Sequence, residues 1–209
     1  MESLPVLQEN FYTSLIEGQI SPDEIQQHAK NYQIHLNGPF FVAAILHISS
    51  AAAGEEDVIS DAMLLSMSVK KLAEEQLAGK WDSKTVTYLG DIIVITQLAD
   101  EESITPFTDR MDRICKMAKR VCKARVTAGI GHVCSRPEQL SASYQGAKNA
   151  ISYRVLYGTT RANNIAETDP QEHGDIPWEE PYIREIIKKI KMGEANALKA
   201  VILQFTSQI

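Results

Sequence analysis

The sequence predicts an α/β fold of the α+β type, a sandwich in which helices flank a mainly antiparallel sheet of about five strands. Two observations indicate this fold. Apolar runs of strand length alternate with amphipathic segments of helix length along residues 40–166. Two β-branched segments, Thr85 to Tyr88 and Ile92 to Thr96, surround a Leu89-Gly90-Asp91 turn, which is the pattern of a hairpin with antiparallel strands.

Two helices are predicted before the sheet. The first carries Leu7, Phe11 and Leu15 on one face and ends at Gly18, because glycine readily adopts the left-handed conformation of a helix end. Ser21 to Glu24 has the sequence Ser-Pro-Asp-Glu, which supplies an N-cap, a proline at the first helical position and a capping-box glutamate. We therefore expect residues 1–36 to form an N-terminal helical pair.

The predicted core order is strand, helix, hairpin, helix, strand, helix, strand. Phe40 to Ile48 is an almost unbroken apolar run, as expected of a central strand covered on both faces. The next helix has an apolar stripe that we expect to pack against this strand, formed by Val58, Ala62, Leu65, Val69 and Leu72. The helix after the hairpin has a second stripe, formed by Phe107, Met111, Ile114, Ala118 and Val121.

Three further elements complete the predicted core. Arg125 to Val133 is expected to be a strand in which Gly129 and Gly131 allow close backbone packing. A helix should begin at Pro137 and end at Gly158, followed by a short edge strand at residues 163–166.

Residues after this core have a different composition. Residues 167–181 are rich in Asp, Glu, Pro, Gly and His, which is typical of a linker. Two amphipathic helices are expected beyond it, with apolar residues Ile183, Ile186, Ile187 and Ile190 on the first and Leu198, Val201, Ile202 and Phe205 on the second. The first stripe is consistent either with docking on the domain's own core or with a signalling or dimer helix.

Composition excludes several function classes. The formal net charge of −6 is unfavourable for binding DNA directly, because such binding depends on clustered Lys and Arg. The three cysteines have no metal-ligand spacing and the five histidines are scattered, so we expect buried thiols, no metal and no cofactor. Without an apolar run of membrane-spanning length, the chain is predicted to be cytoplasmic and not bound to a membrane.

The element order, the Gly-Asp turn and the strand sequence Val126 to Gly131 resemble the nucleotidyl-cyclase fold of GGDEF domains. That family's hairpin reads RYGGDEF, where this chain has Thr87 to Ile93, TYLGDII. A closer resemblance is to the diverged GGDEF-like middle domain of YesN-type response regulators and related AraC-family regulators. It is carried by Phe11 to Ile25, Gly129 to Gly158 and Tyr182 to Phe205.

The resemblance implies that a catalytic member would hold two divalent cations with carboxylates of its first strand and hairpin. The first-strand aspartates fall on His47 and Ser49 here, and the hairpin retains only Gly90 and Asp91. The other family positions have changed as well: Leu89 replaces the first glycine, Ile92 and Ile93 replace glutamate and phenylalanine, Val155 replaces a phosphate-binding lysine, and Lys80 to Ser83 replaces the product-inhibition motif RxxD. We therefore expect no enzymatic activity.

Five residues are candidate ligand contacts: His47, Ser49, Gly90 and Asp91, which would form a relict cyclase cleft, and Arg154, which could reach an anion. Each also has a structural interpretation, since Asp91 suits a turn residue bonding its own backbone and Arg154 a solvated helix residue.

The leading hypothesis is a non-catalytic regulatory or dimerisation domain of an AraC-family transcription regulator, and the alternative is a sensor of a nucleotide or small metabolite. We expect residues 37–168 to be the degenerate GGDEF-like domain and residues 169–209 to lead to a DNA-binding domain outside the chain. The partners implied are a second copy of the chain, DNA through a helix-turn-helix domain, and a sensor kinase through a receiver domain, both domains lying outside the chain.

Overall fold

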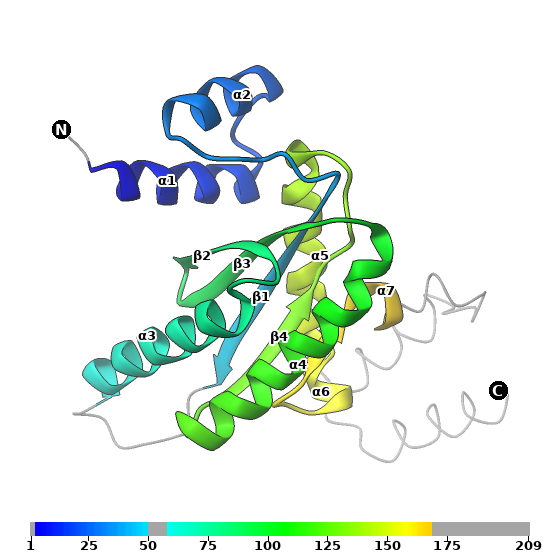
Figure 1. Cartoon of the computed structure of the whole chain (residues 1–209). Helices are drawn as coiled ribbons and strands as arrows, with labels where there is room; N and C mark the ends of the chain where they lie inside the picture. Colours follow the sequence, from blue (N-terminus) through cyan, green and yellow to red (C-terminus); the bar gives the residue numbers. More distant parts are fainter. Residues whose placement is uncertain (1–2, 50–57, 169–209) are drawn as a thin grey trace, which may run out of the picture. The chain divides into compact units, whose positions relative to one another are not determined.

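A five-stranded sheet in the order β2-β3-β1-β4-β5 forms the centre of the computed structural model (Figure 1). The structure describes residues 3–49 and 58–168, which belong to one compact unit. The middle strand β1 (Phe40–Ser49) pairs antiparallel with β3 (Asp91–Leu98) and β4 (Arg125–Ile130). At the edges, β2 (Asp82–Tyr88) pairs antiparallel with β3, and β5 (Ala162–Asn164) pairs parallel with β4. The predicted, mainly antiparallel sheet is confirmed.

Helices cover both faces of this sheet, and the alternation of side chains along β1 creates two cores. Val42, Ala44 and Leu46 contribute to the core that lies under α3 (Val58–Leu77) and α4 (Ile104–Val121). The intervening residues of β1 contribute to the core under α1 (Leu4–Glu17), α2 (Pro22–Asn31) and α5 (Leu140–Ser152). Short helices complete the described part: η1 (Glu101–Ser103), η2 (Pro137–Gln139), α6 (Arg154–Tyr157) and α7 (Ile165–Thr168).

The two N-terminal helices have the predicted ends. Gly18 follows α1 with φ of 70°, the left-handed conformation that glycine adopts without strain. Ser21 and Glu24 form a reciprocal capping box at the start of α2, in which the Ser21 amide donates to Glu24 Oε2 at 2.9 Å. These local signals therefore determine the boundary between α1 and α2.

The apolar stripe predicted for residues 58–72 is only partly correct. From residue 62 onward, where the burial of α3 is described, the buried positions are Val69, Ala73 and Leu77. The helix packs mainly against β2, β3 and α4 rather than against β1. Ala62, expected to be buried, is exposed. The apolar period identified the face of α3 that turns toward the core, but only the carboxyl-terminal half of this helix packs on the sheet.

The strand predicted over residues 125–133 is interrupted after Ile130. Ala44 lies opposite Ile130, so unbroken pairing would place Val133 opposite Phe41, yet Cys134 occupies that place. One extra residue therefore forms a β-bulge. At this bulge Ser143 of α5 replaces the strand partner: its Oγ accepts the Ala43 amide at 2.9 Å.

Two further predictions are corrected in detail. The helix expected from Pro137 to Gly158 is divided into η2, α5 and α6, and the edge strand begins at Ala162 instead of residue 163. Of the three free cysteines, Cys115 is buried as expected, whereas Cys122 and Cys134 are half-buried.

The linker and tail helices expected within residues 169–209 lie outside the described residues. Within the part of the chain that the structure describes, no helix combines the length and apolar character needed to cross a bilayer.

Replacing Gly131 with alanine should destabilise the domain, because the added Cβ would lie 1.9 Å from the Ser143 carbonyl oxygen. We expect a loss of about 3 kcal/mol in the free energy of unfolding, as for overpacking of a tight contact. Gly146→Ala is the matched control, since its Cβ would meet the movable His132 side chain at 3.3 Å. Urea unfolding followed by circular dichroism measures both variants, and equal stabilities would contradict the prediction.

Candidate functional site

The carboxyl end of β1 and the hairpin between β2 and β3 lie side by side in the sheet. Leu46 pairs with Ile92, so His47 and Asp91 are the next two residues opposite each other, at the end of the β1–β3 ladder. Ser49 follows two residues after His47 on the same face of β1, opposite Arg125 of β4.

His47 and Asp91 are joined directly. His47 Nδ1 lies 2.9 Å from Asp91 Oδ1, and about a third of each side chain is exposed, 31% and 32% respectively. The carboxylate is thus held by a side chain of the neighbouring strand, and not by its own backbone as a turn residue would be. The resemblance placed both residues in one relict cleft, but sequence spacing does not reveal that their side chains bond each other.

The hairpin turn has left-handed backbone angles at both of its central residues, although one of them is leucine. Leu89 and Gly90 both have positive φ, 50° and 84°, which are values of a two-residue type I′ turn. Leu89 is 80% exposed, so its side chain gains no packing in compensation for the strained conformation. Gly90 fits the turn without strain and presents no side chain to a ligand.

Arg154, the fifth candidate, does not join this group. Its Nη1 donates to the Ile151 carbonyl at 3.1 Å and so satisfies a backbone acceptor at the end of α5. Among the described contacts, no hydrogen bond or ion pair links it to the other four candidates. None of the five candidates lines the cavity between α1 and α2, either of the two grooves along α3, or the hollow beside Phe40 and His132.

A cluster of side chains from α1, β2 and α5 begins at Tyr88, the residue that pairs with Asp91 across the hairpin. The Tyr88 hydroxyl donates to Glu17 at the end of α1, and its ring meets the Tyr144 ring edge-on at 6.3 Å. Burial, followed by the negative charges of Asp91 and Glu17, raises the pKa of the Tyr144 phenol. Lys148 Nζ lies 5.6 Å from the centre of the same ring.

The residues of this cluster were missed as site residues because they belong to α1, β2 and α5, which are far apart in the sequence. A further polar group, Thr127, lies opposite His47 in the β1–β4 pairing and is fully buried with no hydrogen-bond partner for its Oγ1.

Comparison with protein families agrees with this architecture. The family model described as a GGDEF-like domain matches residues 17–153, about two thirds of the chain. The chain belongs to the GGDEF-like domain family. No curated protein matches it. The family match covers α2 and all the elements from β1 to α5, and therefore includes the His47–Asp91 pair.

The site of this GGDEF-like domain does not fit the two cations that the cyclase fold implies. Magnesium prefers several oxygen ligands, chiefly carboxylates. His47 offers an imidazole, Ser49 a neutral hydroxyl, and Asp91 Oδ1 is already engaged by His47. Within residues 3–49 and 58–168, no three His, Cys, Asp or Glu side chains gather as a metal centre would require.

Restoring the family glycine by Leu89→Gly should stabilise the GGDEF-like domain, because glycine adopts positive φ without a Cβ penalty. We expect about 1 kcal/mol of added stability, the approximate cost of the left-handed conformation. Gly90→Ala is the control of opposite sign, since its Cβ meets no atom within 4 Å and only backbone strain changes. Thermal unfolding measures both variants; a destabilised Leu89→Gly variant would show that the exposed leucine has a stabilising role.

Proposed function

We propose that this GGDEF-like domain is a non-catalytic regulatory and dimerisation domain of an AraC-family transcription regulator. The observation that carries the proposal is the His47–Asp91 hydrogen bond. His47 stands where a cyclase has a cation-binding carboxylate, and its imidazole engages Oδ1 of the one carboxylate that the hairpin retains.

Two other positions support the loss of nucleotide chemistry. Val155, aligned with the family's phosphate-binding lysine, is 84% exposed and offers an anion no charge or hydrogen bond. The segment aligned with the product-inhibition motif contributes to packing: Lys80 Nζ lies 4.4 Å from the centre of the Trp81 ring, which packs edge-on against Phe107. A GGDEF-like fold without the residues for cation and phosphate binding is suited to a structural or regulatory role.

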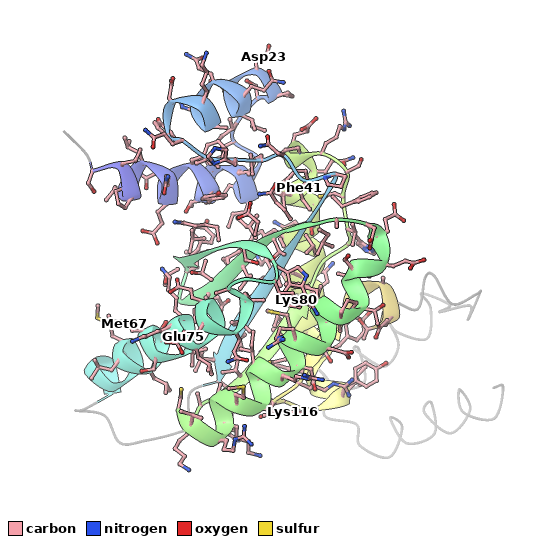
Figure 2. All side chains as sticks on the ribbon, in the orientation of Figure 1. Asp23, Phe41, Met67, Glu75, Lys80 and Lys116 are labelled. Carbon is pink, nitrogen blue, oxygen red and sulfur yellow. The ribbon has the colours of Figure 1, made fainter. Side chains whose placement is uncertain are left out.

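An exposed apolar surface on α3 supports the dimerisation part of the proposal. Met63, Leu64 and Met67 are 67%, 59% and 58% exposed, and Met67 is labelled on α3 in Figure 2. They line a groove of about 790 Å³ that extends to Thr87 of β2. Contiguous exposed apolar residues favour protein association, and a second copy of the chain is the partner that we propose.

The assignment to an AraC-family regulator rests on the sequence resemblance in residues 11–25, 129–158 and 182–205. In this proposal DNA is bound by a helix-turn-helix domain, and signals arrive through a receiver domain and its sensor kinase. Both of those domains would lie outside the present sequence.

The domain should form no cyclic dinucleotide from GTP with Mg²⁺ or Mn²⁺, because its site lacks the carboxylates that would hold the cations. Chromatography of the reaction mixture, with an active cyclase as positive control, measures the product. GTP should also leave the melting temperature unchanged. Product formation would overturn the proposal, and a saturable shift with GTP alone would favour a nucleotide sensor in its place.

Met67→Glu should weaken self-association, because a charge at the centre of the α3 groove opposes burial of that surface. We expect the dissociation constant of the dimer to rise about tenfold or more, equivalent to about 1.4 kcal/mol. Leu156→Glu, which alters an exposed apolar residue on α6, should leave it unchanged. Analytical ultracentrifugation measures both variants, and a wild-type chain that stays monomeric at every concentration would refute the dimer.

A further inference from the structure

A second site lies between the two N-terminal helices, away from the hairpin. Residues of α1, α2 and the segment between them line a cavity of about 370 Å³ that is open to solvent. This volume is in the size range of small-molecule sites. None of its lining residues belongs to the site around His47 and Asp91. The cavity therefore requires a separate explanation.

Each side of the cavity is lined by residues spaced about one helical turn apart. Asn10 and Ser14, four residues apart, face the cavity from α1. Glu24, His28 and Tyr32, at successive spacings of four, face it from α2 and its C-cap. Each helix thus presents one continuous polar and aromatic stripe to the same space.

The aromatic part of this lining is held in place. His28 and Tyr32 stack with ring centres 5.2 Å apart and an interplanar angle of 21°. Phe11, which is buried, meets Tyr32 edge-on at 6.5 Å. Gln8 Nε2 donates to the Tyr32 carbonyl at 2.9 Å and so joins the end of α2 to α1. These contacts preform the site, which lowers the entropy cost of binding.

The charge of the lining favours a cation. Hydrogen bonds from the Ser21 backbone and side chain lower the pKa of the Glu24 carboxyl, so it is ionised at neutral pH. None of the described residues that line the cavity is lysine or arginine. His28 Nδ1 is also buried without a hydrogen-bond partner, so the fold leaves this polar group unused.

We propose that the cavity binds a small organic cation, an amine or a quaternary ammonium, between the Glu24 carboxylate and the rings of His28 and Tyr32. Glu24 lies one helical turn before His28 on α2, and a cation held there is attracted by the carboxylate charge and by the ring face of His28 that does not stack on Tyr32. An anion would be repelled by Glu24, and a neutral polyol would gain neither interaction. The proposal concerns a different surface from the cyclase-derived site and does not depend on the function proposed above.

Isothermal titration of the full chain tests the proposal with choline, putrescine and spermidine at constant ionic strength. Sorbitol and acetate serve as neutral and anionic comparisons. We expect at least one of the cations to bind saturably with one site per chain, and neither comparison compound to bind. Absence of saturable binding by all three cations would overturn the proposal, as would tighter binding of sorbitol or acetate.

Two variants separate the site from general electrostatic attraction. Glu24→Gln removes the charge but keeps a side chain that can complete the capping box, and it should weaken cation binding about tenfold. Asp23→Asn removes the same charge one residue away, at a position labelled on α2 in Figure 2 that does not line the cavity, and it should leave the affinity unchanged. Equal affinities of Glu24→Gln and the wild type would refute the assignment. Circular dichroism verifies that both variants are folded.

Discussion

The close approach of α5 to the sheet is the constraint on which the rest of the structure depends. A Cβ at Gly129 or Gly131 would lie 2.2 or 1.9 Å from the backbone carbonyl oxygens of Ala147 and Ser143, so only glycine permits this distance. The same proximity lets the Ser143 hydroxyl accept the Ala43 amide beside the bulge after β4. It also brings Tyr144 to the hairpin. The helix α1, packed on α5, reaches the hairpin through the bond between Glu17 and Tyr88.

The His47–Asp91 pair shows how the sheet brings two side chains together at the end of β1. Strand pairing places a residue at the end of β1 beside the first residue of β3, whichever side chains occupy the two positions. With carboxylates at such positions, mutual repulsion makes bound cations favourable. With an imidazole and a carboxylate, the two side chains satisfy each other at 2.9 Å. The side chain at the end of β1 therefore determines which partner satisfies Asp91, and here that partner is His47.

Local signals explain which elements were predicted correctly. The capping box at Ser21 and the left-handed Gly18 each depend on residues within a few positions of one another, and each has the expected geometry. The hairpin was also predicted, but Asp91, which the sequence placed in the turn, is the first residue of β3 and pairs with Tyr88. The bulge after Ile130 and the exposure of Ala62 were not predicted, because each depends on a helix that packs from elsewhere in the chain. Periodicity identifies the apolar face of a helix, but not how much of that face meets the sheet.

The candidate site also has some features that residue type determines and others that only packing determines. The sequence by itself determined the fold family, the turn at Gly90 and the absence of carboxylates at His47 and Ser49, because these are properties of residue type and order. Only the tertiary structure decided that Asp91 bonds His47, that Arg154 caps a helix, and that α1 and α2 enclose a cavity. Those outcomes depend on distances between side chains of different elements. Such distances are set by how the elements pack, which no local pattern specifies.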